Sequence, residues 1–221
     1  MTRSESIAFD AGKVVDLRRV VSKGEGQQLE FKRKASFPDK IVRELIAFAN
    51  TDGWTLLIGV DDDKTIPGVK FPDEESIVIH NELKNHCRPG LAFHEVVIPI
   101  SEKRFVLNWR IPKSDKRPHF YVTNGERISF VRHGDQSIKA SKEMTEIMRR
   151  SKSQNGTRFT YGEAEQKIIH FLDAQPAISL REFAQLTRLN RYMASRKIVR
   201  LVLANVLKIT PTDKGDFFSR A

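Results

Sequence analysis

The sequence predicts an α+β fold in two domains: a larger domain with a mixed sheet, then a small helical domain that ends in a hairpin. Residues 25–63 have the pattern of a strand, a helix and a second strand. Strands and helices then interleave as far as residues 149–160, a polar, apolar-poor segment typical of a linker. The interleaving is too irregular for a doubly wound nucleotide-binding fold.

The strand–helix–strand unit organises the first domain. A helix over 38–50 is predicted because Ile41, Leu45 and Phe48 recur at the three- and four-residue spacing of one buried face. Residues 54–60 are nearly all apolar, which favours a central strand. The strand before the helix alternates apolar and charged side chains, Leu29-Glu30-Phe31-Lys32.

The rest of the first domain, taken as residues 13–150, follows from shorter patterns. Acidic residues at the start of the second long helix suit a helix N-terminus, and Ser101-Glu102-Lys103 suits a hairpin turn. The expected helices cover residues 14–21, 73–86 and 143–150, and the expected strands cover 93–100, 104–111 and 127–132.

Several motifs in this domain occur in the order found in one known family: Glu25, Leu29-Glu30-Phe31-Lys32, Ala47-Phe48-Ala49-Asn50-Thr51-Asp52-Gly53, Leu57-Ile58-Gly59-Val60-Asp61, Arg117-Pro118 and Phe130-Val131-Arg132-His133-Gly134. Residues 20–148 thereby resemble the Schlafen-type AlbA-like domain. The resemblance implies a mixed-sheet AlbA-like fold and nucleic-acid binding. The chain departs from the family pattern at Trp54, where the family has a second glycine.

The region after the linker predicts three helices and a hairpin. Ser179 is a good N-cap for the middle helix, with Glu182 completing a capping box. The helices are expected at 163–174, 180–187 and 190–205, and the hairpin strands at 206–210 and 216–219. Residues 158–221 therefore resemble a winged helix-turn-helix domain.

The charge balance favours a polyanionic partner. The formal net charge is +10 and the isoelectric point is about 9.8. Residues 151–221 contain 12 Lys/Arg and 6 Asp/Glu, which gives +6, whereas residues 1–150 contain 26 and 22, which gives +4. The smaller domain therefore carries more than half of the excess positive charge.

The third helix of the smaller domain has the residue pattern of a recognition helix. One side is apolar, with Ala194, Ile198 and Leu201. The opposite side carries side chains suited to base edges and phosphates, Tyr192, Arg196 and Arg200. Lys214 in the hairpin turn, and a basic group in the first domain, are expected to add phosphate contacts: Lys32, Arg33, Lys34 and Arg132. The alternatives are a solvated helix face or a protein-interaction module.

Three carboxylates, Glu25, Glu30 and Asp61, lie at or near the ends of two expected strands. If the strands pair, the carboxylates could converge as ligands for Mg²⁺ or Mn²⁺. Family members that cleave RNA use an acidic trio at matching motif positions, so the resemblance implies the same trio here. The alternative function is therefore a metal-dependent endonuclease acting on RNA or single-stranded DNA. The alternative to a catalytic role for Asp61 is a structural one, in which this residue belongs to a solvated turn after the buried strand.

Other features restrict the cellular context. The single cysteine, Cys87, excludes an internal disulfide and fits a reducing cytoplasm. The sequence has no apolar run of membrane-spanning length, no secretory signal pattern and no glycine-rich phosphate-binding loop. We therefore expect a cytoplasmic, prokaryotic DNA-binding regulator that prefers DNA to RNA, needs no cofactor for binding, and forms a possible homodimer.

Overall fold

The computed structural model describes residues 11–26, 28–151 and 160–221, and the chain divides into two compact units after Ser137. The division precedes helix α4 (Lys142–Arg150), which the sequence analysis had assigned to the first domain. The reason is that Ile147 and Met148 are buried and α4 packs against helix α7 (Arg191–Leu203) of the second unit. The two sequence-based domain ranges stay a prediction.

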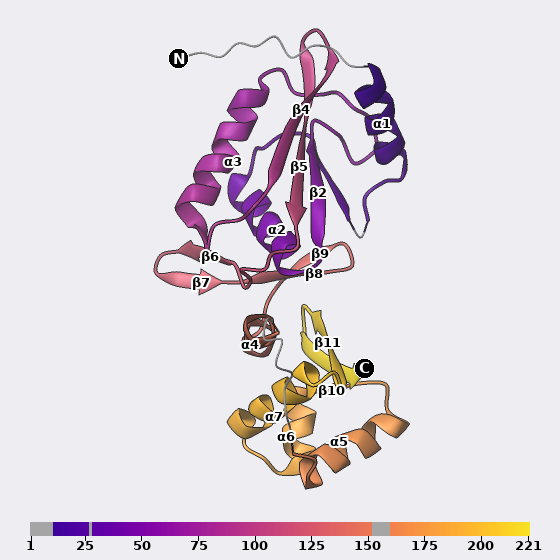
Figure 1. The fold of residues 1–221 in the computed structure, drawn as a ribbon, viewed down its shortest axis with the longest axis vertical. Coiled ribbons are helices and arrows are strands. Elements are labelled where there is room, and N and C mark those ends of the chain that lie inside the picture. Colours follow the sequence, from indigo (N-terminus) through magenta and orange to yellow (C-terminus); the bar gives the residue numbers. More distant parts are fainter. Residues whose placement is uncertain (1–10, 27, 152–159) are drawn as a thin grey trace. The chain divides into compact units, whose positions relative to one another are not determined.

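The first unit is built on a four-stranded sheet with the order β1-β2-β5-β4 (Figure 1). Strand β1 is parallel to β2, and the other neighbours are antiparallel. The parallel pair is joined by helix α2 (Pro38–Asn50), which confirms the expected strand–helix–strand unit. The strands are β1 (Leu29–Lys32), β2 (Gly53–Ile58), β4 (His94–Ser101) and β5 (Arg104–Pro112).

Helices cover both faces of this sheet. Helices α2 and α3 (Pro72–His86) lie on one face and helix α1 (Ala11–Ser22) lies on the other (Figure 1). The alternation along β2 shows the two faces, because Leu56 belongs to the core under α2 and α3 whereas Leu57 belongs to the core under α1. The α+β, mixed-sheet fold predicted for this unit is confirmed.

Gly53 starts β2 in a conformation that other residues rarely adopt. Its φ is +80°, and a Cβ atom there would lie 2.7 Å from the backbone oxygen of Ile111. A glycine is therefore required both by the backbone angle and by the close approach of β5.

The side chain of Asn50, at the end of α2, holds residues 119–130 in place through hydrogen bonds. Its Nδ2 donates to the backbone oxygens of His119 (3.1 Å) and Phe130 (2.9 Å) and to Ser129 Oγ (3.0 Å), and its Oδ1 accepts from the backbone N–H of His119 (2.8 Å). All of these groups lie in the segment between residues 119 and 130, far from Asn50 in sequence. The amide therefore holds that segment against α2.

This anchoring explains one difference from the sequence-based expectation. A single strand over 127–132 was expected, but the structure has two strands that belong to different sheets. The buried side chain of Ser129 donates to the His119 oxygen (2.9 Å), so the chain changes course at that residue. The short strands are β3 (Cys87–Arg88), β6 (Phe120–Thr123), β7 (Glu126–Ile128), β8 (Phe130–His133) and β9 (Gln136–Lys139).

The described part of the second unit contains four helices and a three-stranded sheet of order β10-β12-β11. The expected three helices and hairpin are confirmed as elements, and the two-residue strand β10 is an addition. The core includes Ile168, Phe183, Ile198 and Phe218. The remaining elements are α5 (Glu163–Ala174), β10 (Ile178–Ser179), α6 (Leu180–Thr187), β11 (Leu207–Thr212) and β12 (Gly215–Arg220). None of the described helices is long and apolar enough to cross a lipid bilayer.

Candidate nucleic-acid interface

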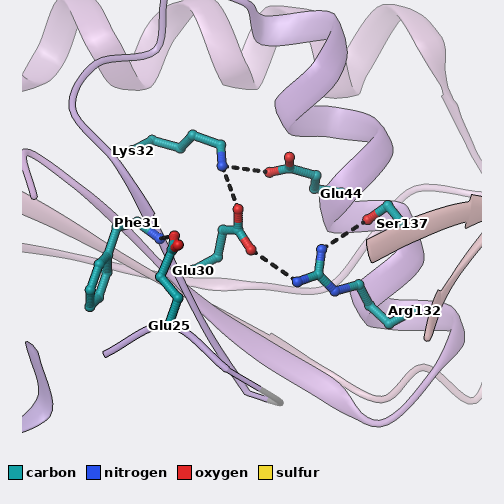
Figure 2. Close-up of polar contacts among 7 residues, drawn as sticks. All are labelled: Glu25, Glu30, Phe31, Lys32, Glu44, Arg132 and Ser137. Atoms are coloured by element: carbon teal, nitrogen blue, oxygen red, sulfur yellow. Dashed lines mark hydrogen bonds and ion pairs between the residues drawn. The ribbon is translucent and has the colours of Figure 1, made fainter. Parts of the chain in front are cut away.

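A charged network joins β1, α2 and β8 in the first unit (Figure 2). Glu30 Oε1 accepts from Lys32 Nζ at 2.5 Å, and Glu30 Oε2 accepts from Arg132 Nη2 at 3.0 Å. Lys32 Nζ also lies 3.5 Å from Glu44 Oε2, and Arg132 Nη1 donates to Ser137 Oγ at 3.2 Å. Two cations and two carboxylates therefore neutralise one another.

The Arg132 side chain is buried at the centre of this network. It is 4% exposed, and its guanidinium carbon lies 5.0 Å from the ring centre of Trp54 and 5.3 Å from that of Phe48. The two rings are themselves stacked at 5.2 Å. The guanidinium thus connects β8 to β2 and α2. Arg132 was expected to contact phosphate, but its buried side chain is not available at the surface.

Trp54, the departure from the family pattern, has a structural role here. A glycine at this position would leave the guanidinium of Arg132 without one of its two aromatic neighbours. The indole therefore contributes to the packing of β8 on α2 and β2.

Burial and ion pairing shift the pKa values of two groups in this network. Burial alone would lower the pKa of Lys32, but the hydrogen bond to Glu30 and the nearby carboxylates outweigh it, so the pKa is raised. Burial raises the pKa of Glu44, and the Lys32 ammonium only partly offsets this. Lys32 therefore remains a cation at neutral pH, with its charge already balanced by neighbours.

The acidic trio predicted from the sequence does not converge in this arrangement. Glu25 Oε1 accepts from the backbone N–H of Phe31 at 2.8 Å, Glu30 binds Lys32 and Arg132, and Asp61 Oδ2 lies 3.3 Å from Arg33 Nη1. No group of three His, Cys, Asp or Glu residues in the described part of the chain could hold one metal ion. In the described geometry, the three carboxylates therefore do not form a shared site for Mg²⁺ or Mn²⁺. The nuclease hypothesis stays a prediction that needs an experiment.

The two other basic residues beside β1 lie at the surface. The Arg33 side chain is 68% exposed and forms its ion pair with Asp61 in solvent. Lys34 is exposed as well. They could approach a phosphate without exposing buried groups.

The candidate recognition face of α7 is exposed, as the sequence predicts. Tyr192 is 67% exposed, and Arg196 and Arg200 are exposed beside it. The guanidinium carbon of Arg196 lies 5.7 Å from the Tyr192 ring centre. The residues on the opposite side are buried in the core of the unit, Ala194, Ile198 and Leu201. Neither arginine forms an ion pair with a described residue.

Local sequence features set the orientation of α7. Asn190 Oδ1 accepts from the backbone N–H of Met193 at 2.9 Å, which caps the helix N-terminus. Arg188 ends α6 in the left-handed conformation, with φ 55°. The joint between the helices is therefore short and turns sharply, as a helix-turn-helix requires.

The two flanks of α7 are held by contacts that leave the Arg196 face exposed. Lys197 Nζ donates to Glu165 Oε1 of α5 at 2.6 Å, and Ser195 Oγ donates to Glu143 Oε1 of α4 at 2.6 Å. Lys214 lies in the turn between β11 and β12 and is exposed. The contacts made by Glu44, Trp54, Ser137 and Glu143 could not be predicted from the sequence, because each forms only through long-range packing.

Comparison with known proteins gives a family match. The family model described as Schlafen, AlbA_2 matches residues 25–141. No curated protein matches the sequence. Among solved structures, the chain is similar to the N-terminal domain of a RecG-related protein from Nitrosomonas europaea, with 22% identity over 53% of this chain and 86% of that chain and a TM-score of 0.43.

A second solved structure is the DIP2311 protein from Corynebacterium diphtheriae. The identity is 16%, the TM-score is 0.45, and the match covers 68% of this chain. The match spans 36% of the DIP2311 chain.

Proposed function

The chain belongs to the Schlafen AlbA_2 family, and we propose that it is a DNA-binding protein whose principal contact is the exposed face of α7. One observation carries this proposal. Two arginines and a tyrosine share an exposed helix face, without an ion pair to a described residue, while the opposite face is buried. The side chains of such a face can donate hydrogen bonds to base edges and phosphates while the opposite face stays packed in the core.

The arrangement of the second unit supports a winged helix-turn-helix. Helices α6 and α7 are joined by a capped turn, and the β11–β12 hairpin follows α7 directly. In this interpretation α7 enters the major groove and Lys214, at the hairpin tip, contacts an adjacent phosphate. Regulation of transcription is the cellular role we propose, and a homodimer reading two half-sites is the assembly we expect.

The contact with the Tyr192 ring restricts the guanidinium of Arg196, the group that would donate hydrogen bonds to DNA. A guanidinium beside an aromatic ring loses less conformational freedom on binding than one that is fully solvated. Arg200, one helical turn further along the same face, would then reach a second group on the DNA. We therefore expect the pair to account for a large part of the affinity.

The test is a fluorescence anisotropy titration of a labelled DNA duplex with the full chain at low salt. For Arg196→Ala/Arg200→Ala we expect a loss of affinity of roughly tenfold to a hundredfold, because each lost contact contributes about 1 kcal/mol or more. The matched control is Arg18→Ala/Lys208→Ala, which removes the same charge from exposed positions on α1 and β11.

Equal affinity losses in the two double variants would show attraction by net charge alone and would contradict the proposal. Undiminished affinity in the α7 variant would favour a protein-interaction module instead. A matched RNA duplex in the same titration tests the preference for DNA, and light scattering at the working concentration tests the homodimer.

A further inference from the structure

The sheet face that carries α1 is only partly covered by that helix. The strand register places Leu29, Thr55, Arg110 and His94 in one row across β1, β2, β5 and β4. The next row is Phe31, Leu57, Asn108 and Val96. Leu17 and Val21 of α1 pack against Phe31 and Leu57, toward the other end of the face. Arg110, His94 and Val96 are exposed.

A cavity of about 720 Å³ lies between α1 and this open part of the face. Its size falls in the range of small-molecule sites, which is about 300–1,000 Å³. Leu17, Leu29 and Leu57 give it apolar walls, and Asn108, Arg110 and Lys23 give it polar groups. All of these residues belong to the first unit. Helix α1 lies on this side of the sheet, and helices α2 and α3 lie on the other (Figure 1).

The charges of the lining favour an anion. The described lining contains three cations, Lys13, Lys23 and Arg110, and two carboxylates, Asp16 and Glu25, which gives a formal charge of +1. Arg110 and Lys23 form no ion pair with a described residue. The available charge of the cavity is therefore positive.

From these observations we propose that this cavity binds a small organic anion. Its anionic group pairs with Arg110, and its apolar part contacts Leu29 and Leu57. A nucleic-acid strand fits less well, because the cavity holds one small molecule and does not follow a row of phosphates. This site is independent of the DNA contact proposed for α7.

The probe for this site is 8-anilinonaphthalene-1-sulfonate, which combines an apolar ring system, a sulfonate and an N–H donor. Its neutral analogue, N-phenyl-1-naphthylamine, has the same rings and N–H without the sulfonate. Titration of the full chain with each dye, followed by dye fluorescence, compares the wild type with Arg110→Ala and Arg18→Ala. Arg18→Ala is the control, an exposed cation on α1 outside the lining.

We expect saturable binding of the anionic dye to the wild type. Arg110→Ala should weaken it about tenfold or more, without affecting the neutral dye, because it removes a charge-assisted contact. Arg18→Ala should weaken the binding of neither dye. Displacement of the bound dye by benzoate or by phenyl phosphate identifies a carboxylate or a phosphate as the preferred group.

Two results would overturn the proposal. The first is binding of the anionic dye that Arg110→Ala leaves unchanged, since Arg110 is exposed and its loss does not threaten the fold. The second is displacement of the dye by a single-stranded oligonucleotide and by neither small anion, which would assign the face to nucleic acid.

Discussion

The cations around Glu30 and the cations on α7 were both predicted to contact phosphate, but the two groups differ in burial and in ion pairing. Arg132 is 4% exposed and pairs with Glu30, whereas Arg196 and Arg200 are exposed and form no ion pair with a described residue. A buried cation that lost its carboxylate to a ligand would leave an unpaired buried charge, which costs several kcal/mol. The comparison shows that burial and pairing decide which basic residue can bind a ligand.

The largest expected effect tests the buried side of this comparison. Arg132→Ala should lower the free energy of unfolding by about 3–5 kcal/mol, because it removes a buried ion pair with Glu30 and the contacts of the guanidinium with Phe48 and Trp54. Arg33→Ala, which removes an exposed ion pair, should change it by less than about 1 kcal/mol. Tryptophan fluorescence in urea measures both, since Trp54 and Trp109 lie in the first unit. Similar losses in the two variants would contradict the distinction.

A smaller effect follows from the raised pKa of Glu44. A carboxyl whose pKa is higher in the folded state stabilises the protein when protonated, and this contribution is lost as the pH rises through the folded pKa. The window therefore starts at the ordinary value of 4.5 and extends upward. Glu44→Gln cannot titrate, so its stability relative to the wild type should improve across this window. Urea unfolding at several pH values measures the difference in unfolding free energy between the variant and the wild type. A difference that stays constant with pH would contradict a raised pKa of Glu44.

The smallest effect concerns metal. Because the three carboxylates of the acidic trio bind separate partners, millimolar Mn²⁺ should leave the unfolding midpoint of the first unit unchanged. A rise that Asp61→Asn abolishes would show a shared ion and restore the nuclease hypothesis. Asp61→Asn is preferable to Glu30→Ala in a cleavage assay with labelled RNA or single-stranded DNA, because Glu30→Ala leaves Arg132 buried and unpaired.

The sequence predicts those features that depend on local periodicity and capping. The apolar spacing of Ile41, Leu45 and Phe48 locates α2, and Ser179 and Asn190 mark the starts of α6 and α7. The exposed face of α7 follows from its helical period alone.

Features that depend on long-range packing could not be predicted in this way. The burial of Arg132 requires that β8 lie beside the stacked Phe48 and Trp54, and nothing near Arg132 in the sequence indicates this. The separation of the three carboxylates depends equally on partners from other elements. The break at Ser129 depends on Asn50, 79 residues earlier.

The central claim is that DNA is bound by the exposed arginines of α7. The most direct test is the slope of log affinity against log salt for a DNA duplex, compared between Arg196→Ala/Arg200→Ala and Arg33→Ala/Lys34→Ala. Each double variant removes two exposed cations. Each lost phosphate contact reduces the slope by about 0.9, so we predict a reduction of up to about 1.8 in the α7 variant and a smaller one in the other. A wild-type slope retained by the α7 variant would contradict the account.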